Sequence, residues 1–486
     1  MKKDQQKPER KEVPKKPRVG EQFEVAVTSL DADGYGLGTF QDMPVLVNGA
    51  LPGETVRARV AYPGKREIFA DTVKVLRHSP ARLQTPPCAK GASCDGCPLI
   101  LMKYSAQLAW KHELVQEELK RYPSLAETQV HEPLPSPKPL HYRNSAKLVV
   151  AGKFSAPVIG IYRRNSHDVI DIGDCPLHHP LINRIVAAVK EGIRKGKVPV
   201  YSARSKTGLL RYLVVRVSET ENRAMAIFVT AERSFNEIHH LAKYLRAAVP
   251  EVEIAVQNVN ASAGNVILGE RDHFLTPRKE LADAIGGVRF AISPRSFFQV
   301  NGGGARLIYE KVREWAGLSG RETVLDLYCG IGGISLFLAP QAREVLGIEA
   351  VEAAVADAEK NARINGAGNC RFEAGDAVEL LEELKSEGKE IDLIVLNPPR
   401  KGCDAQVLRD AAQLAPGRII YVSCSPPTLA RDLDQLSRLG YRTREVQPVD
   451  MFPQTPHVEN VALLERQIKS SQPAVQPTTK ARRTRS

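Results

Sequence analysis

The sequence predicts a multidomain α/β protein whose C-terminal part is a Rossmann-like, doubly wound domain. A chain of 486 residues holds two to four domains at about 100–200 residues each. From about residue 291, apolar strands alternate with helical segments, which is the pattern of a parallel sheet covered on both faces. Residues 20–77 instead alternate short strands with Gly-rich turns, which is typical of a small OB-like barrel. We therefore expect a barrel at 20–80, a central α+β domain at 81–290 and the doubly wound domain at 291–466.

The basic charge of the chain is concentrated at its two ends. Residues 1–19 and 467–486 carry +5 each of the total +12, which leaves +2 for the body. Both ends are rich in Pro, Gln, Ser and Thr, so we expect disordered basic tails that favour a polyanionic partner. The chain has no run of 18 apolar residues and starts with a polar segment, so we expect a cytoplasmic protein without a membrane span.

The first two domains are defined by alternating strands. Residues 23–28 alternate at period two, and the turn at 31–38 is rich in glycine. Such barrels commonly bind single-stranded nucleic acid, and a purely structural module is the alternative because the segment has more acidic than basic residues. A helix is expected at 99–121. In the central domain the pattern predicts strands at 146–151, 210–217, 224–230 and 254–258, and helices at 180–194 and 236–247.

Four buried parallel strands are expected in the C-terminal domain, at 323–327, 344–348, 391–396 and 419–423. Ligands of such sheets bind at the carboxyl ends of the strands. The side chains at those ends are therefore the candidate site, namely Asp326 with Tyr328, Glu349, Asp376, Asn397 and Cys424.

The Gly-rich turn after the first of these strands favours one cofactor class. Its glycines, Gly330, Gly332 and Gly333, do not form the Gly-x-Gly-x-x-Gly pattern of a dinucleotide site, and the chain has no Lys-containing phosphate loop. Glu349 follows the second strand, where a carboxylate accepts hydrogen bonds from both ribose hydroxyls. We therefore expect S-adenosylmethionine, and a dinucleotide-dependent oxidoreductase with an iron–sulfur centre is a disfavoured alternative.

Cys424 and Glu459 are the candidate catalytic pair. Cys424 ends an apolar strand and is followed by Ser-Pro-Pro, although a lone cysteine is more often inert core. A thiolate that adds to uracil C6 makes C5 nucleophilic, and a base must remove the C5 proton after methyl transfer. This reaction requires a thiol, a carboxylate and a methyl donor, with Arg400 as a candidate cation beside the thiol.

Five motifs follow one another along the chain, namely Ser293-Pro-Arg-Ser-Phe-Phe-Gln-Val-Asn301, Leu325-Asp-Leu-Tyr-Cys-Gly-Ile-Gly, Asn397-Pro-Pro-Arg-Lys-Gly, Ser423-Cys-Ser-Pro and Thr455-Pro-His-Val-Glu. With these motifs the chain resembles the RNA uracil-C5 methyltransferase family over about residues 20–466. Gly34-Tyr-Gly-Leu-Gly and Val45-Leu-Val-Asn-Gly-Ala-Leu-Pro-Gly-Glu are similar to the TRAM domain, an OB-type RNA-binding module, and this similarity covers most of residues 20–77. The chain resembles in particular the TRAM-bearing, iron–sulfur-containing members that act on 23S ribosomal RNA.

The resemblance implies a role for each matching residue. Cys424 is the nucleophile, Glu459 is the base, and Phe297 packs near a flipped base. The contacts to S-adenosylmethionine are Gln299, Tyr328, Glu349, Asp376 and Asn397. Two positions depart from the family pattern: many members have Asp at position 397, and some have Asn at position 333. Asn keeps an acceptor oxygen but loses the charge.

Four cysteines form a candidate metal centre. Cys88, Cys94 and Cys97 are followed by the distant Cys175, and four thiolates suit either a [4Fe–4S] cluster or a structural zinc ion. The resemblance, whose cluster-bearing members show this spacing, implies the iron–sulfur cluster.

These observations predict a monomeric, S-adenosylmethionine-dependent enzyme that methylates C5 of a uridine in 23S ribosomal RNA. The T-loop uridine of transfer RNA is the alternative substrate, since the catalytic motifs do not distinguish the two. A non-catalytic RNA-binding assembly factor is a further alternative, and the intact Cys424 and Glu459 argue against it.

Overall fold

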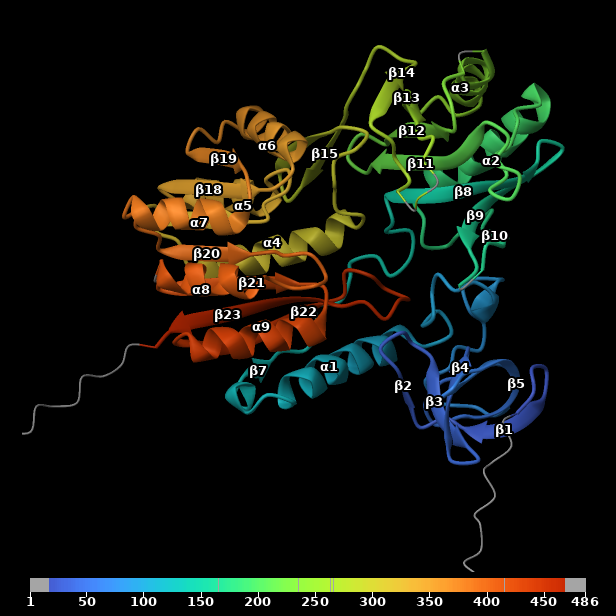
Figure 1. Cartoon of the computed structure of the whole chain (residues 1–486), viewed down its shortest axis with the longest axis horizontal. Helices are drawn as coiled ribbons and strands as arrows, with labels where there is room; N and C mark the ends of the chain where they lie inside the picture. Colours follow the sequence, from blue (N-terminus) through green and yellow to red (C-terminus); the bar gives the residue numbers. More distant parts are fainter. Residues whose placement is uncertain are drawn as a thin grey trace, which may run out of the picture.

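The structure is a computed structural model that describes residues 17–164, 166–234, 236–262, 264, 266–414 and 416–467. Apart from residues 17–19 and 467, the two predicted basic tails lie outside the described residues. The described chain forms an N-terminal half-barrel, a central sheet and a larger sheet flanked by helices (Figure 1). No helix in the described part of the chain is both long and apolar enough to cross a bilayer.

The N-terminal segment is a six-stranded sheet that curls around its own apolar core. Its strands are β1 Gln22–Ala26, β2 Ser29–Leu30, β3 Gly36–Phe40, β4 Met43–Asn48, β5 Thr55–Pro63 and β6 Ile68–Arg77, in the order β1-β5-β6-β4-β3-β2. The period-two pattern is confirmed in β1, where Phe23 and Val25 are buried between exposed neighbours. The curled sheet is a half-barrel with β1 and β2 at its edges, which is less closed than the predicted barrel.

The central sheet is buried on both faces. Its strands are β8 Ser145–Lys153, β9 Ala156–Tyr162, β10 Val169–Asp171, β11 Leu210–Ser218, β12 Arg223–Thr230, β13 Val252–Val259 and β14 Arg271–Phe274, and its helices are α2 Pro180–Gly196 and α3 Asn236–Ala248. The strand order is β10-β9-β8-β11-β12-β13-β14. Leu213 and Val215 of β11 share a core with α2 and α3, whereas Val214 between them joins the core of the C-terminal domain. The four strands and two helices predicted here are all present.

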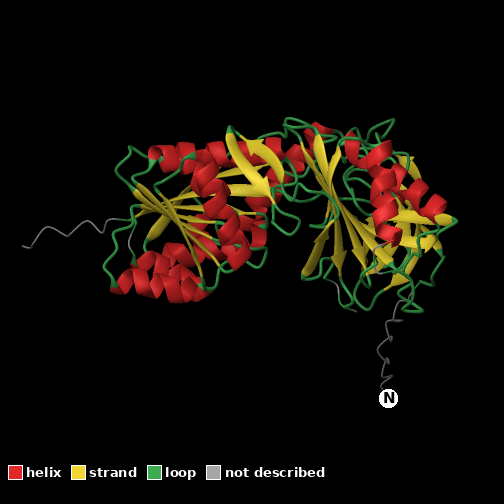
Figure 2. Ribbon diagram, turned by 90° about the horizontal axis from the view of Figure 1, so that it is seen from above, coloured by secondary structure: helices red, strands yellow, loops and turns green. Residues whose placement is uncertain are grey.

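The C-terminal domain contains an eight-stranded sheet with helices on both faces (Figure 2). Its strands are β17 Thr323–Leu327, β18 Glu344–Glu349, β19 Cys370–Ala374, β20 Leu393–Leu396, β21 Arg418–Ser423, β22 Tyr441–Val449 and β23 Glu459–Arg466, with β7 Gln129–Val130 at one edge. The helices are α4 Gly302–Ala316, α5 Gly333–Leu338, α6 Glu352–Asn365, α7 Ala377–Ser386, α8 Ala405–Gln413 and α9 Pro426–Arg438. The hairpin of β15 Leu281–Ile285 and β16 Val288–Ile292 precedes them, and three short 3-10 turns complete the elements, η1 Gly91–Ser93, η2 Pro123–Leu125 and η3 Ala339–Gln341.

The strand order of this sheet is β19-β18-β17-β20-β21-β23-β22-β7. Strands β17 to β21 are parallel, as predicted, whereas β23 is antiparallel to both β21 and β22. The order reverses at β17, which is the point where ligands of such sheets bind.

One segment from the N-terminal half of the chain belongs by packing to the C-terminal domain. Helix α1 Tyr104–Lys120 contacts α9, and β7 pairs in parallel with β22 (Figure 1). From the sequence we expect these residues to belong to the central domain at 81–290. Single-chain periodicity does not reveal this pairing, because a two-residue strand carries no pattern of its own.

Candidate active site at the carboxyl edge of the sheet

The sheet register places Cys424 opposite Glu459. Strand β21 ends at Ser423, which pairs with Asn460 of the antiparallel β23. Continuing this register by one residue brings Cys424 to face Glu459, the first residue of β23. Both side chains are partly buried. A thiol and a carboxylate that lie 35 positions apart in the sequence thus meet at one edge of the sheet.

Arg400 lies close to both of these groups. Its guanidinium hydrogen-bonds the Cys424 side chain and approaches His457, with Nη2 to Nε2 at 3.4 Å. Burial raises the pKa of the Cys424 thiol, the Glu459 carboxylate raises it further, and Arg400 lowers it. Burial also raises the pKa of Glu459 to about 7, against the opposing effect of Arg400. Burial and Arg400 lower the pKa of His457 to about 4, so this imidazole is neutral at pH 7.

The Gly-rich turn after β17 has a strained backbone. Tyr328 has φ of 65°, in the left-handed region that a bulky side chain rarely adopts. The amide groups of Tyr328 and Cys329 both donate to the carbonyl of Ile348, which holds the turn against β18. Such strain concentrates at ligand-binding sites. Gly330 and Gly332 complete the turn with φ of 57° and 82°.

Glu349 ends β18 and Asp376 follows β19, the two strands next to β17 on one side of the sheet. The Glu349 carboxylate accepts from the Gly330 amide at 3.1 Å and from the Val351 amide at 3.1 Å. Asp376 caps α7 by accepting from the Val378 amide at 2.8 Å. Burial raises the pKa of Tyr328, and Cys403 and Asp376 raise it further. Asn397 follows β20, and its backbone amide donates to the Leu327 carbonyl at 3.3 Å. The residues predicted to contact S-adenosylmethionine at the ends of β17, β18, β19 and β20 therefore gather at the carboxyl edge of the sheet.

Gln299 reaches the same edge from outside the sheet. Its backbone carbonyl accepts from Asn144, and its side chain hydrogen-bonds the Tyr309 hydroxyl of α4. Phe297, two residues earlier, is 70% exposed. Sequence reasoning missed Tyr309, because a tyrosine within an amphipathic helix is indistinguishable from ordinary core.

Asp326 is a buried carboxylate beneath the turn. Its Oδ2 accepts from the Ser335 hydroxyl at 2.5 Å, and its Oδ1 has no hydrogen-bond partner within the described part of the chain. Burial raises the pKa of Asp326 to about 7.

The loop before Glu459 is held by groups from distant parts of the chain. Lys111 of α1 forms a fully buried ion pair with Asp450 at 2.5 Å. Gln107 of α1 accepts a hydrogen bond at its side-chain Oε1 from the Gln454 backbone amide at 2.9 Å. The Tyr142 hydroxyl donates to Pro453, and Asn301 donates to Met451. The buried face of α1 is therefore polar where it meets this loop, at Gln107 and Lys111.

Replacing Lys111 by methionine should destabilise the protein by about 3–5 kcal/mol. The substitution leaves Asp450 charged and buried, while its Oδ2 already has no partner among the described residues. Urea unfolding measures the change, and Lys120→Met on the exposed side of the same helix is the matched control. Equal unfolding free energies for the two variants would contradict a structural role for the Lys111–Asp450 pair.

The structure brings the four candidate metal-binding cysteines into one neighbourhood. Burial raises the pKa of the Cys97 thiol, and Cys175, Cys94 and Cys88 raise it further. Burial likewise raises the pKa of Cys175, whose turn is fixed by two hydrogen bonds to the Asn183 side chain. Within the described ranges, no three His, Cys, Asp or Glu residues are grouped so as to hold a single metal ion.

Comparison with known proteins agrees with this geometry. A family model described as tRNA (Uracil-5-)-methyltransferase matches residues 103–467. An uncharacterized RNA methyltransferase of Geobacter sulfurreducens is 64% identical over 92% of this chain and 91% of its own length. Another from Caldanaerobacter subterraneus is 40% identical, over 93% and 99%. The crystal structure of Pyrococcus abyssi tRNA (uracil-54, C5)-methyltransferase with S-adenosyl-L-homocysteine matches with a TM-score of 0.74 and 29% identity, over 91% of this chain and 100% of the other.

The doubly wound sheet and the side chains at its carboxyl edge define an S-adenosylmethionine-dependent RNA methyltransferase. More narrowly, the chain belongs to the RNA (uracil-5-)-methyltransferase family, whose reaction is methylation of uracil C5 in RNA.

Proposed function

We propose that the chain methylates C5 of a uridine in 23S ribosomal RNA, with Cys424 as the nucleophile and Glu459 as the base. The observation that carries the catalytic assignment is the facing pair at the ends of β21 and β23, with Arg400 hydrogen-bonded to the thiol. The uridine is extruded from folded RNA into this site. The exposed ring of Phe297 is a surface on which the flipped base stacks.

The reaction begins at Cys424. Its thiolate forms a bond to uracil C6, and the electron pair of the C5–C6 double bond passes to C5 and O4. Arg400 favours the thiolate over the thiol through its charged hydrogen bond. C5 then attacks the methyl carbon of the donor, and the sulfonium sulfur leaves with the electron pair of its bond to that carbon.

Glu459 completes the turnover. Its carboxylate removes the proton from C5, the C5–C6 double bond forms again, and the Cys424 thiolate leaves C6. The products are 5-methyluridine, S-adenosylhomocysteine and one proton on Glu459. A carboxylate with a pKa of about 7 is well matched to accept this proton near neutral pH.

S-adenosylmethionine, the methyl donor, is held along the Gly-rich turn. We assign the ribose hydroxyls to Glu349, because this carboxylate ends β18 beside the turn. Tyr328 and Asp376 lie together at the end where the adenine fits. Gln299 and Asn397 line the remaining side, and the amide of Asn397 offers one acceptor and one donor group in place of a carboxylate.

The rate should rise with pH, because both catalytic groups must be deprotonated. Glu459, with a pKa of about 7, is mostly protonated at pH 6 and mostly ionised at pH 8. The pKa of Cys424 is raised by burial, so its thiolate fraction is still increasing through this interval. A plot of log kcat/KM against pH should have a slope of about two below pH 7 and about one above it. A rate that is constant or falling between pH 6 and 8 is incompatible with these roles.

Arg400→Gln should lower kcat/KM at pH 7.5 by about 10- to 100-fold, through loss of a charged hydrogen bond. The pKa of Cys424 rises without this cation, so the variant should recover part of the rate as the pH is raised. Arg409→Gln is the matched control, because Arg409 is exposed on α8 and bonds only Gln406 in the described contacts. A defect that is the same at every pH would contradict the effect on the thiol.

We assign the binding of the surrounding RNA to the half-barrel and the central domain. Arg164 of the central domain forms an ion pair with Asp33 of the barrel turn at 2.6 Å and lies over the Tyr35 ring at 5.0 Å. Burial and Arg400 lower the pKa of His457, and Asp33 acts against them, so the barrel turn lies on the side of His457. This arrangement supports the proposal that the half-barrel, as a TRAM-type module, contacts RNA next to the target base.

The preference for 23S ribosomal RNA rests on the TRAM-like segment and the cysteine spacing, because the catalytic motifs do not distinguish the two RNAs. Transfer RNA is the second candidate, because the structurally similar Pyrococcus abyssi enzyme acts on uracil 54 of transfer RNA. Mapping of 5-methyluridine in a strain that lacks this chain separates the two. Loss of 5-methyluridine from 23S RNA alone supports our preference, and loss of 5-methyluridine from the transfer RNA T-loop alone would overturn it.

We also propose that Cys88, Cys94, Cys97 and Cys175 hold an iron–sulfur cluster. The support is the all-sulfur donor set and the mutual influence of the four thiols, together with the spacing. Zinc is the alternative, because four cysteine thiolates also suit a structural zinc ion. Anaerobic purification should yield about four iron atoms per chain, and Cys175→Ser should lose them while Cys370→Ser retains them. Stoichiometric zinc without iron would refute the cluster.

A further inference from the structure

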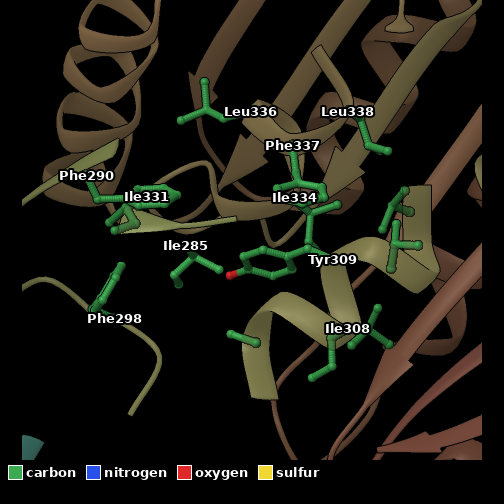
Figure 3. Packing of buried hydrophobic residues seen from close by; sticks show 14 of the residues in the cluster. Ile285, Phe290, Phe298, Ile308, Tyr309, Ile331, Ile334, Leu336, Phe337 and Leu338 are labelled. Carbon is green, nitrogen blue, oxygen red and sulfur yellow. The ribbon is translucent and has the colours of Figure 1, made fainter. Parts of the chain in front are cut away.

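Tyr309 is a buried tyrosine whose hydroxyl lies within an apolar core. Its side chain is 6% exposed, and its ring packs on Phe337 with centroids 5.7 Å apart. Figure 3 shows this ring among Ile285, Ile334 and Phe337, with its oxygen as the polar atom in that group. A buried phenol hydroxyl requires a hydrogen-bond partner, so the identity of that partner indicates what the residue does.

The hydroxyl faces the Gly-rich turn. A Cβ atom added to Gly333 would lie 2.5 Å from Tyr309 Oη, closer than real Cβ contacts. The hydroxyl therefore fills the space that a side chain at position 333 would take. Gly333 is the first residue of α5 and directly follows Gly332, whose φ is 82°. The polar group beside the turn thus comes from α4 and not from the turn itself.

The hydroxyl also holds Gln299. The segment from Pro294 to Val300 has no regular secondary structure, so the Gln299 side chain is oriented by its neighbours alone. Asn144 fixes its backbone carbonyl at 3.0 Å, and Tyr309 hydrogen-bonds its side-chain amide. Burial raises the pKa of Tyr309, and Asp326 and Glu459 raise it further, so the hydroxyl keeps its proton throughout the working pH range.

We propose that Tyr309 positions the methyl donor indirectly: its hydroxyl lies against Gly333 and orients the Gln299 side-chain amide toward S-adenosylmethionine. This inference rests on the proposed role of Gln299 as a donor contact. This positioning role can be told from a packing role by experiment, because Tyr309→Phe keeps the ring and its contact with Phe337 and removes only the hydroxyl.

Tyr309→Phe should weaken binding of S-adenosylhomocysteine to the full chain by about tenfold, measured by calorimetry, which is the effect of losing one hydrogen bond. KM for S-adenosylmethionine should rise by a similar factor, while kcat changes less. Tyr441→Phe is the matched control, since Tyr441 begins β22, away from the Gly-rich turn, and its buried hydroxyl donates to the Pro416 carbonyl at 2.9 Å. Unchanged affinity of Tyr309→Phe would overturn the proposal.

A second pair of variants tests the contact with Gly333. Gly333→Ala places a methyl group 2.5 Å from the hydroxyl, so we expect it to weaken S-adenosylhomocysteine binding in the wild-type background. Removing the hydroxyl removes this contact, and the same substitution in Tyr309→Phe should have a smaller effect. Independent effects of the two substitutions would contradict the assigned contact, since neighbouring residues are expected to couple.

Failure of this inference can be told from failure of the proposed function. If the wild-type chain binds S-adenosylhomocysteine and methylates uridine while Tyr309→Phe matches it in both respects, only the role of Tyr309 is refuted. If the wild-type chain binds S-adenosylhomocysteine, with Tyr309→Phe weakened, but methylates no uridine, the proposed function fails and the role of Tyr309 in binding stands.

Discussion

Replacing Cys424 by alanine should abolish uridine methylation, with a decrease of about 10⁴-fold or more in kcat. Without the thiolate, C6 receives no nucleophile and C5 does not become reactive toward the methyl donor. Binding of S-adenosylhomocysteine should be unchanged, because the donor residues lie on β17 to β20 and on the Gln299 segment. Methyl transfer from labelled S-adenosylmethionine to RNA measures the first effect, and calorimetry measures the second.

Cys370→Ala is the matched control for this variant. Cys370 begins β19 at the far edge of the sheet and is likewise partly buried. Methylation by Cys424→Ala at a rate similar to that of Cys370→Ala would exclude Cys424 as the nucleophile.

Glu459→Gln should stop the reaction after methyl transfer. The amide has no basic oxygen for the C5 proton, so the double bond is not restored and Cys424 remains bonded to C6. We expect turnover to fall by about 10²- to 10⁴-fold and a methylated RNA–protein adduct to accumulate. Denaturing gel electrophoresis with labelled RNA detects the adduct, and one equivalent of S-adenosylhomocysteine should form with it.

Glu465→Gln is the appropriate comparison, because Glu465 lies on the same strand and pairs with Arg444 at the surface. It should turn over normally and leave no adduct. If Glu459→Gln neither slows turnover nor accumulates adduct, another group must be the base.

Much of the C-terminal domain follows from local pattern. The strand at 323–327 is found with the predicted bounds, and the residues at the strand ends meet because parallel strands share a carboxyl edge. Cys424 and Glu459 required chemical reasoning as well, since their register appears only once β23 pairs antiparallel with β21.

The remaining parts of the site depend on contacts between distant segments. Lys111 and Gln107 look like surface residues of an ordinary helix, and their buried partners lie more than 330 positions further on. Tyr309 looks like core, and its hydroxyl gains meaning only beside Gly333. Such contacts have no periodicity, so single-sequence reasoning does not predict them.

The catalytic proposal is tested most directly with RNA that carries 5-fluorouridine at the target position. Fluorine on C5 leaves no proton for Glu459 to remove, so the reaction should halt after methyl transfer. We expect a covalent adduct of RNA, methyl group and protein in which mass spectrometry of the digested chain locates the RNA on Cys424. The absence of any adduct in the presence of S-adenosylmethionine, or attachment to a different residue, would contradict the proposed mechanism.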